Sequence, residues 1–118
     1  MKILHLTLKK KWFDMIASGE KKEEYRQIKG YWMKRLLNEH GDSFKLFDVI
    51  RFKNGYNQYA PTMDVECKGI EVGDGKPKWG CNKRTFIIKL GKIISIKNYT
   101  QSDEIERSSS YNTICKTT

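Results

Sequence analysis

Residues 62–72 read Thr-Met-Asp-Val-Glu-Cys-Lys-Gly-Ile-Glu-Val, and this stretch largely determines the fold expected for the chain. Apolar side chains alternate from Met63 to Cys67, which is the period of a strand with one buried face. The alternation then changes phase at Lys68 and Gly69. One extra residue at a glycine is typical of a β-bulge, and bulges bend sheets toward barrels. We therefore expect a strongly curved sheet.

Shorter elements are predicted on both sides of this stretch. Alternating apolar residues indicate strands at 2–8, 22–26, 47–53, 62–72 and 86–96, and helical spacing indicates helices at 10–18 and 30–39. In the last strand we expect one apolar face, made of Phe86, Ile88, Leu90, Ile94 and Ile96. The pattern predicts an α+β, mainly β fold: a small mixed β-barrel of about five to six strands, with two short N-terminal helices covering one opening.

Composition predicts one domain that stays out of membranes. The 118 residues are 38% apolar and 31% charged, enough for one modest core. We find no run of about 18 apolar residues and no secretory pattern at the N-terminus, so we expect a cytoplasmic protein. Residues 1–98 are expected to form the domain. Residues 99–118 are rich in serine and threonine, which predicts a polar tail or a peripheral extension.

The charge balance favours a polyanionic partner. The net charge of +9 attracts polyanions such as RNA through long-range steering and counterion release. A solvated basic surface without a specific partner would have the same composition. The three cysteines form no C-x-x-C pair and the chain has two histidines, so we expect neither a metal site nor a cofactor.

The most informative polar residues follow the first predicted helix. Gly19, Lys21, Glu24 and Arg26 have the spacing Gly-x-Lys-x-x-Glu-x-Arg. Because side chains alternate along a strand, Glu24 and Arg26 are expected to share one face, with Lys21 at the turn before them. A guanidinium and an ammonium bind phosphates, and a carboxylate accepts hydrogen bonds from an amino group or a hydroxyl. This predicts a ligand site or, alternatively, an ion-pair network that joins the helix to the barrel.

Basic and aromatic residues near this motif extend the candidate site. Lys9, Lys11 and Lys22 flank the same junction and are candidates for phosphate contact, with a solvated lysine as the alternative for each. Tyr25 lies within the motif, and Trp79 lies in a predicted loop beside lysines and a glycine. Aromatic faces stack on nucleobases, so both residues are candidates for ligand contact, with packing as the alternative.

The motif Gly19-x-Lys21-x-x-Glu24-x-Arg26, preceded by a strand and a short helix, resembles the ASCH domain of the PUA-like superfamily. The resemblance covers about residues 2–97. It implies a cleft between barrel and helices, floored by the motif, that binds RNA or modified nucleosides. One ASCH-like branch hydrolyses N4-acylated cytidine, and its proposed nucleophile is a threonine where this chain has Glu24.

We therefore expect a monomeric binding module for RNA or a nucleotide-like small molecule, held by Lys21, Glu24 and Arg26. The first alternative is a small hydrolase that acts on a modified nucleoside, like the N4-acylcytidine amidohydrolases, or on RNA. In that alternative Lys21 is the base and Glu24 carries or orients the proton. The second alternative is an adaptor that uses the basic face to bind an acidic protein.

Overall fold

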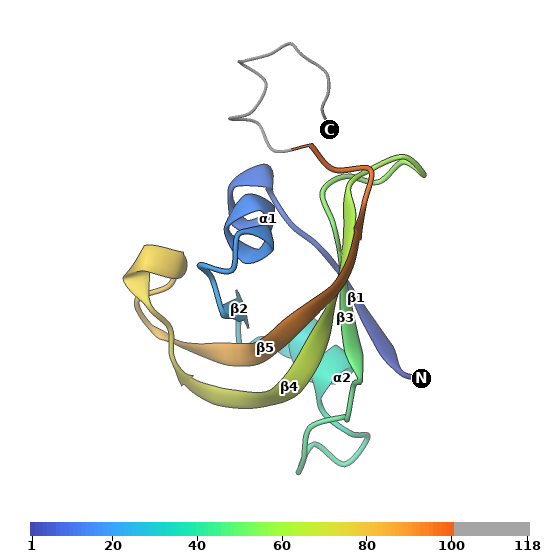
Figure 1. Ribbon diagram of the computed structural model, residues 1–118. Coiled ribbons are helices and arrows are strands. Elements are labelled where there is room, and N and C mark those ends of the chain that lie inside the picture. The colour runs from blue at the N-terminus through green and yellow to red at the C-terminus, as the bar shows by residue number, and fades with distance from the viewer. Residues whose placement is uncertain (101–118) are drawn as a thin grey trace.

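Five strands and two α-helices make up residues 1–100, the part of the chain that the structure, a computed structural model, describes (Figure 1). The strands are β1 (Ile3–Thr7), β2 (Glu23–Arg26), β3 (Val49–Lys53), β4 (Thr62–Asp74) and β5 (Arg84–Lys97). The helices are α1 (Lys10–Ala17) and α2 (Gly30–Leu36), and a 3-10 turn, η1, covers Pro77–Trp79. The predicted α+β, mainly β class is confirmed.

The strands form one mixed sheet that curls into a half-barrel (Figure 1). Their order is β1-β3-β4-β5-β2, with β1 and β3 parallel and the other neighbours antiparallel. β1 and β2 are the free edges of the described sheet, so it stops short of the closed barrel that we expected. We call the gap between the edge of β1 and the segment formed by β2 and α2 the seam.

The curvature arises where β4 pairs with β5. Lys68 is skipped in the register between Cys67 and Gly69, which is the bulge predicted from the change of phase. Gly69 has a φ of 131°, a conformation that glycine adopts without the steric cost of a Cβ. Further register shifts lie between Asp64 and Cys67. Successive shifts increase the local twist, which is why two long strands can wrap around one core.

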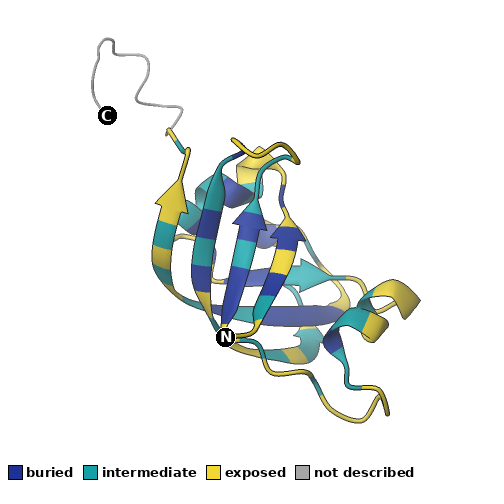
Figure 2. Cartoon of the chain, turned by 90° about the vertical axis from the view of Figure 1, so that its right-hand side faces the viewer, coloured by how far each residue is buried: buried dark blue, intermediate teal, exposed yellow. Residues whose placement is uncertain are grey.

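The core fills the concave side of the sheet. Figure 2 shows buried and exposed positions alternating along the strands, as expected for a sheet with one buried face. The two helices contribute to the same core through one side of each. Its largest fully buried side chains include Phe13 from α1, Leu36 from α2, Phe52 from β3, Met63 from β4 and Ile88 from β5.

One part of the predicted core face is wrong. Ile94 is 54% exposed and Ile96 is 36% exposed, and Ile93 packs against the core instead. In the pairing with β4, Ile94 is skipped between Ile93 and Ser95. A one-residue shift of register sends each following side chain to the opposite face, so the shifts in this pairing leave both Ile94 and Ile96 outside the core.

A tight turn at Gly19 connects α1 to β2. Gly19 has a φ of 88°, and its N–H donates to Ile16 O at 3.0 Å. Lys21 N then donates to Met15 O at 3.0 Å, which draws the backbone of Lys21 against the end of the helix. The positive φ explains why the motif begins with glycine. The turn also directs the Lys21 side chain inward.

The predicted tail is described only at its first two residues. Tyr99 packs against α1: its ring centroid lies 5.2 Å from that of Phe13, and its hydroxyl donates to Asp14 at 2.9 Å. Residues 101–118 lie outside the described residues. Within residues 1–100, none of the helices has the length and apolar character needed to cross a bilayer.

Candidate ligand-binding cleft

A cleft of about 310 Å³ opens at one end of the seam. One wall comes from the end of β1 and the start of α1, and the facing wall comes from β2 and the turn η1. The cleft therefore lies where the sheet fails to close. Its lining residues are Thr7, Leu8, Lys9, Trp12, Glu24, Tyr25, Arg26, Trp79 and Gly80. Five of the eight predicted site residues are among them: Lys9, Glu24, Tyr25, Arg26 and Trp79.

The three charged residues of the motif converge on the carboxylate of Glu24. Lys21 Nζ donates to Glu24 Oε1 at 2.6 Å, and Arg26 Nη2 lies 3.0 Å from Glu24 Oε2. Each carboxylate oxygen thus has one cationic partner. Charge-assisted hydrogen bonds of this length are the stronger ones in proteins. Glu24 and Arg26 line the cleft and present this ion pair to it.

Lys21 lies behind Glu24, outside the cleft lining. Its side chain is 1% exposed, and Nζ also donates to the backbone oxygen of Glu23 at 2.6 Å. Lys21 Nζ lies 5.5 Å from the ring centroid of Trp12 and 5.5 Å from that of Tyr25, which is close enough for cation–π attraction. The ammonium is therefore fully engaged by the protein, and its effect on the cleft passes through Glu24.

Arg26 holds the seam together. Its Nη2 donates to Thr7 O at 3.2 Å on the free edge of β1, and its guanidinium lies 5.1 Å from the ring centroid of Trp32. A planar guanidinium can stack and donate hydrogen bonds at the same time, which an ammonium cannot do. Arg26 is thus fixed in orientation from three sides: by β1, by Glu24 and by Trp32.

Two buried N–H groups at the cleft have no hydrogen-bond partner among the described residues. They are Nε of Arg26 and Nε1 of Trp79, and both residues line the cleft. A buried donor without a partner costs about 1–3 kcal/mol. Both donors therefore lack an acceptor from the described protein, and both belong to residues that line the cleft.

Aromatic side chains form the walls. Trp79 is 7% exposed, and Trp12 and Tyr25 are partly buried beside it. Gly80 has a φ of 97°, and a Cβ at this position would lie 2.8 Å from Cζ2 of Trp12. Glycine is therefore required both by the backbone conformation and by the close approach of the indole.

The η1 wall is tied to β2 by Tyr25 and Glu23. The Tyr25 hydroxyl donates to Glu23 Oε1 at 2.7 Å and accepts from Lys76 N at 3.1 Å. Lys89 Nζ donates to Glu23 Oε2 at 3.2 Å. Burial and the hydrogen bond to Glu23 raise the pKa of Tyr25 well above its ordinary value. This arrangement holds the backbone that leads into Trp79.

Glu23 predicts how stability depends on acid pH. Burial raises its pKa, but hydrogen bonds from Tyr25 and Lys89 and the charge of Lys76 outweigh this, so the pKa lies below its ordinary value of 4.5. A depressed carboxyl pKa stabilises the fold above the unfolded pKa, and the contribution is lost as pH falls through the folded pKa. We expect Glu23→Gln to destabilise the fold by a constant amount above about pH 5 and by less in more acidic solution.

Urea titrations of both proteins between about pH 3 and pH 7 measure this difference, because the free energy of unfolding is obtained at each pH. The ion pair between Arg51 and Asp64 is an internal control, because its own pH dependence is the same in both proteins and cancels in the difference. The hydrogen bond and charge of Arg51 lower the pKa of Asp64, and this pair is present in both proteins. A difference in stability that stays constant down to the lowest pH would contradict the role assigned to Glu23.

The flanking lysines take different positions. Lys9 lines the cleft. Lys11 is exposed and outside the lining, and its Nζ lies 4.7 Å from the ring centroid of Trp12, which lines the cleft. Lys22 is exposed and outside the lining. Sequence reasoning did not include Lys76 and Lys78, which lie 5.3 Å and 4.8 Å from the ring centroid of Trp79.

Two residues at or beside the cleft were not predicted from the sequence. Trp12 lines the cleft, although its helical spacing with Met15 and Ile16 predicts only core packing. Glu23 has no signal of its own, since it is one of two adjacent glutamates. Across residues 1–100, no group of three or more His, Cys, Asp and Glu side chains is placed to hold a metal ion.

Comparisons with protein-family models, with curated proteins and with solved structures found no match to this chain. The resemblance of the Gly19–Arg26 motif to the ASCH domain therefore stays a prediction.

Proposed function

We propose that this chain is an ASCH-like domain that binds RNA or a nucleotide-like ligand, with one base in the cleft. The observation that carries the proposal is the pair of unpartnered donors, Arg26 Nε and Trp79 Nε1, beside the Glu24–Arg26 ion pair in an aromatic-walled hollow. A cleft of about 310 Å³ is at the small end of ligand sites, which suits a nucleoside.

Each chemical group of a nucleotide has a matching group in the cleft. The rings of Trp12, Tyr25 and Trp79 offer apolar surfaces for a base. The unpartnered donors suit its carbonyl or ring-nitrogen acceptors, and Glu24 suits an exocyclic amino group or a ribose hydroxyl. Lys9 at the cleft and the overall charge of +9 suit a phosphate.

The position of Lys21 favours binding over hydrolysis. A general base needs reach to the proton that it removes, and Lys21 is 1% exposed and hydrogen-bonded to Glu24 and to the Glu23 backbone. Its hydrogen bonds support a positioning role for Glu24. In our proposal Lys21 therefore holds the Glu24 carboxylate in its orientation toward the cleft, through the 2.6 Å hydrogen bond to Oε1.

Titration of the intrinsic tryptophan fluorescence with the four ribonucleoside monophosphates tests this proposal, since two of the three tryptophans line the cleft. We expect saturable binding of at least one nucleotide. Arg26→Lys should weaken it by about tenfold or more, because a lysine replaces neither the donor Nε nor the stacked plane. Arg51→Lys is the matched control: Arg51 also pairs with a carboxylate, at 2.7 Å from Asp64, but lies outside the cleft.

Two results would overturn the proposal. One is the absence of saturable binding of any of the four nucleotides. The other is equal weakening by Arg26→Lys and Arg51→Lys, which would place the effect in the fold rather than in the cleft. Thermal unfolding of both variants separates loss of binding from loss of structure.

A further inference from the structure

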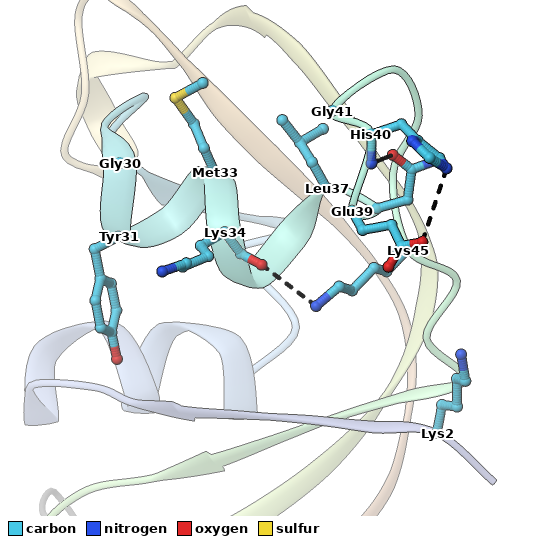
Figure 3. A pocket seen from close by; sticks show the side chains of 11 residues that line it. Lys2, Gly30, Tyr31, Met33, Lys34, Leu37, Glu39, His40, Gly41 and Lys45 are labelled. Atoms are coloured by element: carbon cyan, nitrogen blue, oxygen red, sulfur yellow. Dashed lines mark hydrogen bonds and ion pairs between the residues drawn. The ribbon is translucent and has the colours of Figure 1, made fainter.

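A second, larger hollow lies along α2, at the other end of the seam. It has a volume of about 1200 Å³ and is lined by α2, by the residues that follow it and by Lys2. Figure 3 shows it extending from Tyr31 toward Lys45 and Lys2. Lys2, Lys34 and Lys45 contribute three positive charges, whereas Glu39 is the one carboxylate of the lining. We call this hollow the α2 groove.

Two large side chains of α2 that line the groove are open to solvent. Tyr31 is 59% exposed and Met33 is 42% exposed. The flexible thioether of Met33 can adapt to surfaces of different shape. An exposed tyrosine next to lysines is the combination that binds a base and its phosphate together.

A continuous stack of side chains connects the α2 groove to the cleft. Arg35 lies 5.7 Å from the Tyr31 ring centroid and 5.3 Å from that of Trp32, and Arg26 covers Trp32 at 5.1 Å. The rings of Tyr31 and Trp32 also contact each other edge to face, at 4.9 Å. Tyr31 belongs to the groove and Arg26 to the cleft, so the stack spans the seam between them.

We propose that the α2 groove is a second subsite for single-stranded RNA, and that one strand runs along the seam from the cleft to the groove. This inference rests on the proposed function, because it extends the same binding site. The cleft takes one base, and the stack of guanidinium groups and rings supports the strand between the two hollows. Tyr31 stacks on a further base, Lys34 contacts the phosphate of that base, and Lys2 contacts a phosphate further along the strand.

The seam fits an RNA strand better than an acidic peptide. An extended peptide would bind the free edge of β1 through backbone hydrogen bonds. Two carbonyls of that edge are already occupied, because Arg26 donates to Thr7 O at 3.2 Å and Arg35 donates to His5 O at 3.3 Å. Planar rings and guanidinium groups, in contrast, match the faces of unpaired bases.

Length dependence of binding tests the inference. The base bound most tightly as a monophosphate is used to prepare homopolymeric RNA of two, four and eight nucleotides, and affinity is measured by fluorescence at several salt concentrations. We expect the octamer to bind about tenfold or more tightly than the monophosphate, since a second base stacks and further phosphates are neutralised.

Variants of the groove separate the two subsites. The double variant Lys2→Ala, Lys34→Ala should lower the salt dependence of octamer binding by about 1.4 in the logarithmic slope, because two phosphate contacts are lost. Tyr31→Ala should weaken the octamer about tenfold, and Tyr31→Phe should restore it, since stacking needs the ring alone. Neither change should alter binding of the monophosphate. The control for charge is Lys92→Ala, Lys97→Ala, two exposed lysines outside both hollows.

The outcomes are distinguishable. If no monophosphate binds, the proposed function fails. If the monophosphate binds but the octamer binds no more tightly, or if Tyr31→Ala and the control variant weaken the octamer equally, the inference about the α2 groove fails and the cleft proposal stands. A third result would assign the groove to an acidic protein instead. A poly-glutamate peptide would then displace the octamer but not the monophosphate, and Tyr31→Ala would bind the octamer as tightly as the unmodified chain.

Discussion

Replacing Glu24 by glutamine is expected to lower the free energy of unfolding by about 3–5 kcal/mol, which is the usual cost of removing one partner from a buried ion pair. Glu24 Oε1 accepts from Lys21 at 2.6 Å and Oε2 faces Arg26 at 3.0 Å. A glutamine must turn its amino group toward one of these two cations. Because Lys21 is 1% exposed, water cannot replace the lost acceptor.

Urea denaturation measures the effect, and Asp64→Asn is its control. Asp64 pairs with Arg51 at 2.7 Å on the solvent side of the sheet, where the Arg51 side chain is 36% exposed. Breaking that pair should cost about 1 kcal/mol or less. The double variant Lys21→Met, Glu24→Gln should recover part of the loss, because the unpaired ammonium is gone. Equal losses in Glu24→Gln and Asp64→Asn would show that the buried pair has no special weight.

Gly80→Ala is expected to cost about 2–4 kcal/mol and to abolish nucleotide binding in the cleft. Part of the cost, about 1–2 kcal/mol, comes from the left-handed backbone, since φ is 97°. The rest comes from overpacking, because the new methyl group would lie 2.8 Å from Cζ2 of Trp12. To relieve this contact the indole must move, and Trp12 is a wall of the cleft.

Gly41→Ala separates the two contributions. Gly41 has a φ of 74°, and a Cβ there would meet no atom within 4 Å, so only the backbone cost of about 1–2 kcal/mol applies. Thermal or urea unfolding gives both free energies, and nucleotide titration gives both affinities. The explanation fails if Gly41→Ala is as destabilising as Gly80→Ala, or if Gly80→Ala binds nucleotides as tightly as the unmodified chain.

Local sequence patterns predicted the helices and strands and the bulge in β4, but not the irregularity in β5. The change of phase at Lys68 and Gly69 correctly placed a bulge, because both the extra residue and the glycine are visible in one strand. The irregularity at Ile94 was missed. It depends on how β5 pairs with β4, and the residues of one strand contain no information on the register of its partner.

The end of α2 illustrates the same limit. Apolar spacing predicts a helix to residue 39, but α2 ends at Leu36. Leu37 adopts an extended conformation and forms a bridge with Phe44, while the Asn38 side chain accepts from His40 N at 3.1 Å. A side chain that satisfies the backbone in this way competes with the helix, and a long-range bridge decides the outcome.

The sequence predicted the shared face of Glu24 and Arg26 but not the burial of Lys21. Glu24 and Arg26 share a strand face and meet at the cleft, as alternation requires. The burial of Lys21 follows from the turn at Gly19 and from the hydrogen bond of Lys21 N to Met15 O. That path exists only once α1 and β2 are packed together, so spacing along the chain cannot show it.

The arginines on the edge of β1 also bear on how copies of this protein behave when they meet. An unpaired strand edge is a template on which a neighbouring chain can add a strand, and this is a common route to aggregation. Here two of its carbonyls accept from Arg26 and Arg35. Because an added strand would need these carbonyls as acceptors, the two arginines make the edge of β1 a poorer template for a second copy of the chain.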